Sequence, residues 1–166
     1  MFKSRMFKYF LLLGLTACSR SSAGDAPKNE VVYVKGNDAA MSAAIAKAQA
    51  SLDTFRAALT TPPAGAQNFS VKVGFPWGIK DDREHIWLIE PKLDDTSVTG
   101  KVNNEPVDVM TLKLGQVVTA PLKDVSDWMY VENGVLRGGY TLRVLLDKMS
   151  PDMRKKMLGE MGFRLE

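Results

Sequence analysis

The spacing of hydrophobic residues changes twice along this chain, and these changes constrain the fold more than any other feature. Between residues 41 and 59 the apolar positions recur three and four residues apart, which places them on one face of a helix. These positions are Met41, Ile45, Ala48, Leu52, Phe55 and Leu59. Between residues 69 and 136 a strand-like period of two dominates, and the helical period returns from residue 142. This order of elements predicts an α+β fold.

The first helical segment has clear boundaries. Asp38 is a good N-cap residue, and a short run of β-branched and aromatic residues, Val31 to Val34, precedes it. Pro62 and Pro63 end the segment, because the residue before a proline avoids the α region. We therefore expect one long N-terminal helix that packs on the sheet.

The central part predicts a mostly antiparallel sheet of about five strands. The segment 69–75 alternates apolar residues with Ser70, Lys72 and Gly74, which predicts a half-buried strand. The segment 85–89 is apolar on both faces and predicts a central strand. Further strands are expected over residues 98–102, 116–120, 128–132 and 135–136. Asn133-Gly134 lies between the last two, and it is a strong hairpin signal because both residues tolerate a positive φ.

Two short helices are expected at the C-terminal end. The first presents Leu142, Leu145, Leu146 and Met149 on one face. The second starts at Ser150-Pro151, with an N-cap and a proline in the first turn. Its expected buried residues are Met153, Met157 and Met161.

A single cysteine, Cys18, stands at the end of a leader-like segment. Lys3, Arg5 and Lys8 are basic, Tyr9 to Leu15 is apolar, and Leu15-Thr16-Ala17-Cys18 follows. Even the stretch from Tyr9 to Cys18 is about half of the roughly 20 residues that a membrane-spanning helix needs, so a spanning helix is excluded. An ordinary secretory signal peptide remains an alternative, although it needs no cysteine at the cut.

The segment resembles the leader and lipobox of bacterial lipoproteins. The resemblance implies that residues 1–17 are a signal peptide and that Cys18 carries acyl chains, palmitate among them. Residues 18–29 would form a flexible tether that reaches about 30 Å when extended, and residues 30–166 a single domain. Ser19 in place of an aspartate implies the outer membrane, facing the periplasm, rather than the inner membrane.

Removing the leader changes the charge of the chain. The full sequence has 22 basic and 19 acidic residues, and residues 1–17 hold three basic residues and no acidic one. The remaining chain therefore has 19 of each, which removes the case for nucleic-acid binding. Because its only cysteine would carry lipid, the mature chain has no disulfide, thiol nucleophile or thiolate metal site.

From about Val31 to Gly159 the chain resembles the YegJ-like family of bacterial proteins, known as domain of unknown function 2314. The matching stretches are MSAAIAKAQASL (41–52), FSVKVGF (69–75), EHIWL (84–88), GKVNNEP (100–106), KLG (113–115), SDWMY (126–130) and GGYTLRVL (138–145). The resemblance implies no particular activity and no catalytic residues.

His85 is the candidate catalytic residue, because it is the only histidine and imidazole titrates near neutral pH. A general base needs an orienting acid, and Asp127, Glu105 or Asp108 would serve if the fold brought one close. The alternatives are a structural histidine near a strand end and a residue of a ligand-binding site.

Two further segments are candidate ligand-binding sites. Asn103, Asn104 and Glu105 form a short polar loop that either presents ligand contacts or is a plain turn. Trp128 and Tyr130 should share one face of a strand, either in the core or as a platform for a glycan or peptide. The chain has no phosphate-binding loop and no serine-hydrolase motif, and we expect neither a cofactor nor a metal.

These observations favour a lipid-anchored, non-enzymatic binding module of the cell envelope, with a protein, peptide or glycan as its ligand. One alternative is a periplasmic hydrolase that uses His85 with a carboxylate. Another is a structural or envelope-assembly factor.

Overall fold

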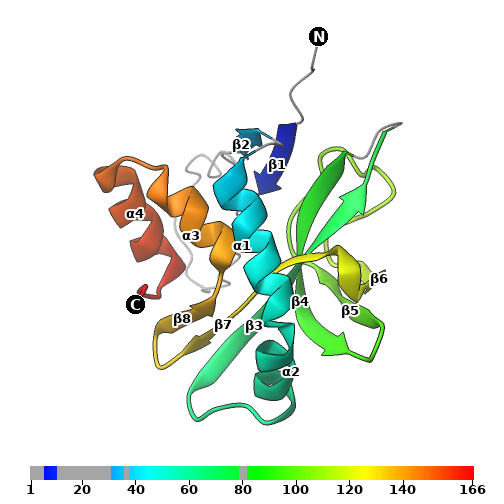
Figure 1. Cartoon of the computed structure of the whole chain (residues 1–166), viewed down its shortest axis with the longest axis horizontal. Helices are drawn as coiled ribbons and strands as arrows, with labels where there is room; N and C mark the ends of the chain where they lie inside the picture. Colours follow the sequence, from blue (N-terminus) through cyan, green and yellow to red (C-terminus); the bar gives the residue numbers. More distant parts are fainter. Residues whose placement is uncertain (1–5, 11–30, 36–37, 79–81) are drawn as a thin grey trace, which may run out of the picture.

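The computed structural model describes residues 6–10, 31–35, 38–78 and 82–166 of the chain; Cys18 and the expected tether, 18–29, lie outside these ranges. The helices are α1 (Ala39–Ala50), α2 (Leu52–Thr60), α3 (Tyr140–Asp147) and α4 (Pro151–Met161), with a short 3-10 helix, η1 (Leu122–Asp124). The strands are β1 (Met6–Phe10), β2 (Val31–Lys35), β3 (Ala66–Pro76), β4 (Arg83–Leu93), β5 (Ser97–Val102), β6 (Val117–Pro121), β7 (Val125–Glu132) and β8 (Val135–Gly138). The predicted α+β class is confirmed (Figure 1).

All the described strands join one sheet. Its order is β2-β1-β4-β3-β7-β8, and β5 continues from β4 with β6 beyond it. Each pair is antiparallel except β1 with β4, so the prediction of a mostly antiparallel sheet is confirmed. The expected number of about five strands is too small, because six strands lie between Ala66 and Gly138. Strand β1 lies within the predicted leader, and β2 contains the predicted Val31–Val34 run.

Helices α1 and α2 cover one face of the sheet. The buried positions of α1 and α2, Ala48, Phe55 and Ala58 among them, form one cluster with Val71, Val73, Ile86 and Leu88 of β3 and β4 and with Trp128 and Tyr130 of β7. Asp38 caps α1 as predicted, and its carboxylate accepts from the backbone of Ala40 and Met41 at 3.0 and 3.2 Å.

The predicted long N-terminal helix is wrong in two respects. In the described residues β1 precedes it in addition to the expected run at Val31–Val34, and it consists of two helices that meet at Ser51. The Ser51 hydroxyl donates to the Lys47 carbonyl at 2.7 Å and accepts from the Trp128 indole at 3.2 Å. A serine that bonds back to its own helix favours a bend. The stripe residues on both sides of Ser51, Ala48 and Phe55, remain in the core on the sheet, whereas Met41 packs against Leu145 of α3.

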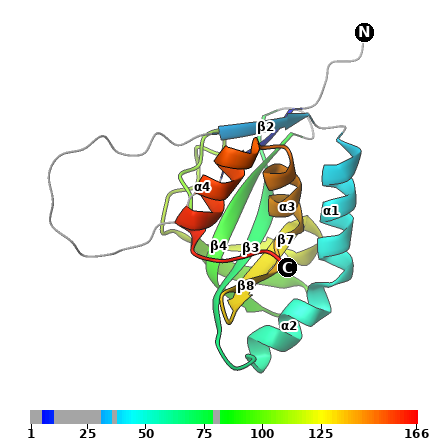
Figure 2. The same ribbon diagram turned by 90° about the vertical axis from the view of Figure 1, so that its left-hand side faces the viewer.

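Helices α3 and α4 pack on the other face at the β7–β8 end of the sheet. Their cluster contains Leu142, Leu146 and Met161 together with Val131 and Leu136 from the hairpin. Figures 1 and 2 show α3 between α1 and α4. The predicted hairpin is confirmed, since Asn133 and Gly134 both have a positive φ, 51° and 77°.

The methionine stripe expected for α4 holds only in part. Met161 is buried and Met157 half-buried, but Met153 is exposed, because only the C-terminal part of α4 reaches the core. No helix in the described ranges is long and apolar enough to cross a bilayer.

The contribution of the core beneath α2 to folding stability can be tested at Phe55. Its ring is fully buried and lies 5.3 Å from Trp128 and 6.0 Å from Phe69 between ring centroids. We expect Phe55→Ala to lower the free energy of unfolding by about 3–5 kcal/mol, measured by chemical denaturation. The control Met110→Ala alters a side chain that is 83% exposed and should change it by less than about 0.5 kcal/mol. Equal effects of the two changes would contradict this packing.

Candidate functional site

A cluster of buried polar side chains lies on the sheet face opposite α1 and α2. The sequence predicted that the Ser70–Lys72–Gly74 side of β3 faces solvent, and this is wrong, because all three residues are buried. Pairing of β3 with β4 and β7 places Lys72 between Trp87 and Asp127. His85, Ser126 and Thr141 complete the group, which we call the polar cluster.

Asp127 connects the sheet to helix α3. Its carboxylate accepts from the backbone N–H groups of Trp128 (2.9 Å), Tyr140 (3.0 Å) and Thr141 (2.8 Å), and from the Thr141 hydroxyl (2.5 Å). The N-cap of α3 is Gly139, which has no side chain to satisfy the first turn. Asp127 therefore caps α3 from a neighbouring strand, and its negative charge suits the positive end of the helix dipole.

A register shift and a glycine make this contact possible. The pairing of β3 with β7 shifts between Lys72 and Val73, so one extra residue, Ser126, is accommodated next to Asp127. Gly138 has a φ of 70°, and a Cβ there would lie 2.2 Å from the Trp128 carbonyl oxygen. Only glycine lets the chain pass this close to β7 before α3 begins.

Lys72 is fully buried and extends the Asp127 network. Its Nζ donates to the Thr141 hydroxyl at 2.7 Å, and that hydroxyl donates to Asp127. The ammonium also lies 4.6 Å from the centre of the Trp87 ring, within cation–π range. Burial lowers the pKa of Lys72 to about 8, although the Asp127 charge opposes the shift, and burial raises the pKa of Asp127.

His85 contacts Ser126 in the same cluster. The two side chains are 2.8 Å apart through His85 Nδ1, and the Ser126 hydroxyl donates to the Lys72 carbonyl at 3.3 Å. Burial, followed by the charges of Lys72 and Arg83, lowers the pKa of His85 to about 3. The imidazole is therefore neutral at physiological pH.

A histidine next to a serine is an arrangement found in nucleophilic catalysis, but several features here oppose that role. Both side chains are buried, and burial and the charges of Lys72 and Arg83 hold the pKa of His85 far below the value that suits a general base at neutral pH. The hydrogen bonds of Asp127 go to α3 and Trp128, and Glu84 bonds to a loop backbone. The polar cluster therefore fits a structural network better than a reactive site.

Glu84 precedes His85 and holds the loop that follows β5. Its carboxylate accepts from the backbone N–H groups of Val107 (2.7 Å), Asp108 (2.9 Å) and Val109 (2.8 Å). Three backbone donors on one carboxylate fix the path of a loop as a helix N-cap does.

The predicted Asn103–Asn104–Glu105 loop lies at the edge of β4. The Asn103 N–H donates to the Trp87 carbonyl at 2.8 Å, and the buried Asn104 side chain accepts from the Trp87 N–H at 2.8 Å. Glu105 is exposed. The two asparagines thus continue the pairing of β4 where β5 ends.

Trp128 and Tyr130 lie in the core under α1 and α2. The Trp128 indole donates to the Ala48 carbonyl at 3.0 Å, and the Tyr130 ring stacks on Phe69 with 4.9 Å between centroids. Among the predicted site residues, the structure brings His85, Asn103 and Asn104 together along β4. Trp128 and Tyr130 lie on the opposite face of the sheet.

Sequence reasoning missed Lys72, Asp127 and Thr141 as one network. A period of two does not reveal whether the second face of a strand is covered, because that depends on α3 and on distant chain segments. The one available signal was a glycine pair before α3 without an N-cap side chain, which implies a cap from elsewhere. In the described segments, no three His, Cys, Asp or Glu residues lie together as a metal site.

The protonation state of His85 can be measured directly. We expect its NMR ring signals to stay those of the neutral imidazole from pH 8 down to about pH 4, because the folded pKa is about 3. Since the unfolded pKa is higher, stability should fall as pH drops from about 6.5 toward 3. A ring that titrates between pH 6 and 7 in the folded chain would restore His85 as a candidate general base.

The lowered pKa of Lys72 leads to a second prediction, which concerns the pH dependence of folding stability. Its folded pKa, about 8, lies below the ordinary lysine value of 10.5, so the unfolded chain binds more protons between these two pH values. Stability should therefore gain up to about 3 kcal/mol from pH 8 to pH 10.5. Denaturation curves should show this gain in the unaltered chain and lose it in Lys72→Met, whereas Lys155→Met on the surface of α4 should retain it. A gain that persists in Lys72→Met would mean that another group causes it.

Two comparisons with known proteins extend over most of this domain. The profile of the family described as "Uncharacterized protein conserved in bacteria (DUF2314)" matches residues 38–165. The chain is 31% identical to "Uncharacterized protein YegJ" of Escherichia coli (strain K12) over 137 residues, which cover 82% of this chain and 87% of that protein.

A second similar protein matches a smaller part of the chain. The chain is 35% identical over 71 residues, 43% of its length, to the "Putative ankyrin repeat protein NMB1133/NMB1171" of Neisseria meningitidis serogroup B, of which it spans 28%. No solved structure matches the chain significantly. The family profile and the YegJ similarity both extend over most of the domain, and the chain belongs to the DUF2314 family of bacterial proteins.

Proposed function

We propose that this chain is a lipoprotein of the bacterial cell envelope that acts as a non-enzymatic binding module. The Leu15-Thr16-Ala17-Cys18 sequence after a basic and apolar leader supports the anchor. Two or more acyl chains on Cys18 would give stable attachment, whereas one chain gives only marginal binding. Ser19 favours the outer membrane, with the domain in the periplasm.

The observation that carries the binding role is an exposed apolar segment on a firmly held loop. Of the five large hydrophobic residues that are exposed in the described structure, four come from residues 107–117. They are Val107 (42% exposed), Met110 (83%), Leu114 (55%) and Val117 (61%). Single exposed apolar residues are ordinary, but four in one segment support the proposal of an interaction surface.

This segment, which we call the apolar loop, is anchored at both ends. Glu84 holds residues 107–109, and the Gly115 N–H donates to the Val102 carbonyl at 2.8 Å. Val109 is buried and Leu112 packs against the core. A surface that is already ordered loses little conformational entropy when a partner binds.

The chemistry of the apolar loop favours a protein ligand over a glycan. Its exposed side chains are aliphatic or thioether groups, whereas glycan sites stack sugars on aromatic rings. The aromatic pair that the sequence offered for such stacking, Trp128 and Tyr130, lies in the core. The buried neutral His85 and the structural use of Asp127 weigh against the hydrolase alternative.

Mass analysis of the chain recovered from membranes tests the anchor. We expect a mature N-terminus at a lipid-modified Cys18, and we expect Cys18→Ala to remain uncut and to leave the outer-membrane fraction. An unmodified N-terminus in the soluble fraction of the unaltered chain would contradict the anchor.

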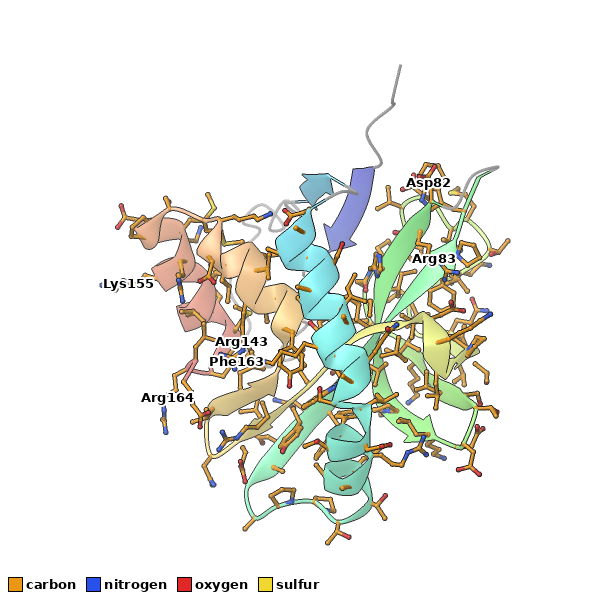
Figure 3. The ribbon with its side chains drawn as sticks, in the orientation of Figure 1. Asp82, Arg83, Arg143, Lys155, Phe163 and Arg164 are labelled. Atoms are coloured by element: carbon orange, nitrogen blue, oxygen red, sulfur yellow. The ribbon has the colours of Figure 1, made fainter. Side chains whose placement is uncertain are left out.

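Photocrosslinking in intact cells tests whether the apolar loop is a binding surface. A photoreactive residue at position 110 should form an adduct with one envelope protein, and Leu114→Asp should reduce it at least tenfold. The control position is Lys155, an exposed residue of α4. It lies at the opposite side of the molecule from Arg83, which is next in sequence to Glu84, the residue that holds the apolar loop (Figure 3). Adducts with lipid alone would assign the apolar loop to the membrane surface, and equal adducts at both positions would contradict a specific binding surface. One abundant structural protein as partner would favour the assembly-factor alternative.

A further inference from the structure

Strand β4 has two different neighbours along one of its edges. Strand β5 pairs with its C-terminal half, from Leu88 to Leu93, and β1 pairs in parallel with Glu84 and His85. Between them, the backbone N–H and C=O of Trp87 bond to Asn104 and Asn103. Backbone groups alternate direction along a strand, so those of His85 point to the same edge as those of Trp87. Strand β1 is therefore what covers the backbone of His85.

Strand β1 comprises residues 6–10, which lie inside the predicted leader. If residues 1–17 are removed, as the proposed function requires, this cover is lost. Strand β2 loses its partner at the same time, because the described pairing of β2 is with β1. Maturation would thus leave an open edge on β4 and an unpaired strand beside it. Open backbone groups at a sheet edge are costly when buried and invite aggregation when exposed.

We infer that β2 pairs directly with β4 in the mature chain and takes the place that β1 occupies in the full-length chain. The directions allow it: β1 is parallel to β4 and antiparallel to β2, so β2 runs antiparallel to β4. The displacement is one strand spacing, about 4.8 Å. Residues 36–38 connect β2 to α1, and about three residues can span roughly 10 Å.

The registers of β1 with β2 and with β4 also specify the register that β2 would adopt with β4. Tyr9 pairs with Val32 on one side and with His85 on the other, and Lys8 pairs with Tyr33 and Glu84. A straight lateral movement therefore places Val32 opposite His85 and Tyr33 opposite Glu84, with each residue kept on its own face of the sheet. The sequence Val31-Val32-Tyr33-Val34 has the β-branched and aromatic residues that strands favour.

This rearrangement has a consequence for the anchored protein. Figures 1 and 2 place β1 and β2 at the same end as the start of β4 and the segment between β5 and β6, whereas α2 lies at the opposite end. The lipid tether would then start from the sheet edge next to His85. That end of the domain, with the loop held by Glu84, would be the part closest to the membrane.

Amide hydrogen exchange in two forms of the chain tests the inference. One form is the mature lipidated chain in detergent, and the other is uncut Cys18→Ala, which keeps β1. We expect slow exchange at His85 and at residues 32–34 in both forms. Val32→Pro removes one backbone donor from β2 and should speed the exchange of the His85 amide at least tenfold in the mature chain. The same change should leave His85 protected in the uncut chain, where β1 still covers it.

Ser21→Pro, in the tether, is the matched control and should alter neither form. Slow exchange at Val71 and Val73 in the centre of the sheet verifies that each variant is folded. Fast exchange at His85 in the mature chain, or protection that survives Val32→Pro there, would overturn the inference. Failure of the proposed function is distinguishable, because the mass of the envelope-derived chain would then still include residues 1–17.

Discussion

The carboxylate of Asp127 is the contact on which the arrangement of the two halves of the domain depends. It lies on a central strand, fully buried, and accepts four hydrogen bonds, three of which come from the start of α3. Without it, the first turn of α3 would be buried with unsatisfied N–H groups, since Gly139 offers no side chain. The buried charge in turn requires Lys72, which reaches it through Thr141 and rests on Trp87. One network therefore connects β3, β4, β7 and α3, and breaking one partner would leave an uncompensated charge in the interior.

The same network decides what His85 can do. The imidazole lies next to a lysine and an arginine and away from water, and all of these conditions favour its neutral form. A neutral, buried ring hydrogen-bonded to Ser126 fits a role in positioning strands. The nearby Glu84 carboxylate is committed to a loop backbone, so the two adjacent titratable residues serve opposite faces of β4. The Glu84 contact has an indirect functional consequence, because it orders the apolar loop that we propose as the binding surface.

Several parts of this architecture could be predicted because they depend on local chemistry. The helix stripe from Met41 to Leu59, the Asp38 cap, the Asn133-Gly134 hairpin and the proline start of α4 all follow from residues close in sequence. The division of the first helix at Ser51 was not predictable, because the serine bonds to Trp128, which is distant in the chain. The burial of Lys72 was missed for the same reason: a period of two identifies two faces but does not say whether the second is covered.

By itself, the sequence determined the α+β class, most element positions, the charge balance of residues 18–166, and the family, since each of these is encoded in composition or in short motifs. It also supplied the basis for expecting lipid on Cys18. Only the tertiary structure decided which polar residues are buried together, that Trp128 and Tyr130 belong to the core, and that the exposed apolar residues are concentrated in residues 107–117. The physical reason is that burial and pairing are properties of two or more segments at once. A residue's own neighbours in sequence carry no information about which distant strand or helix will cover it.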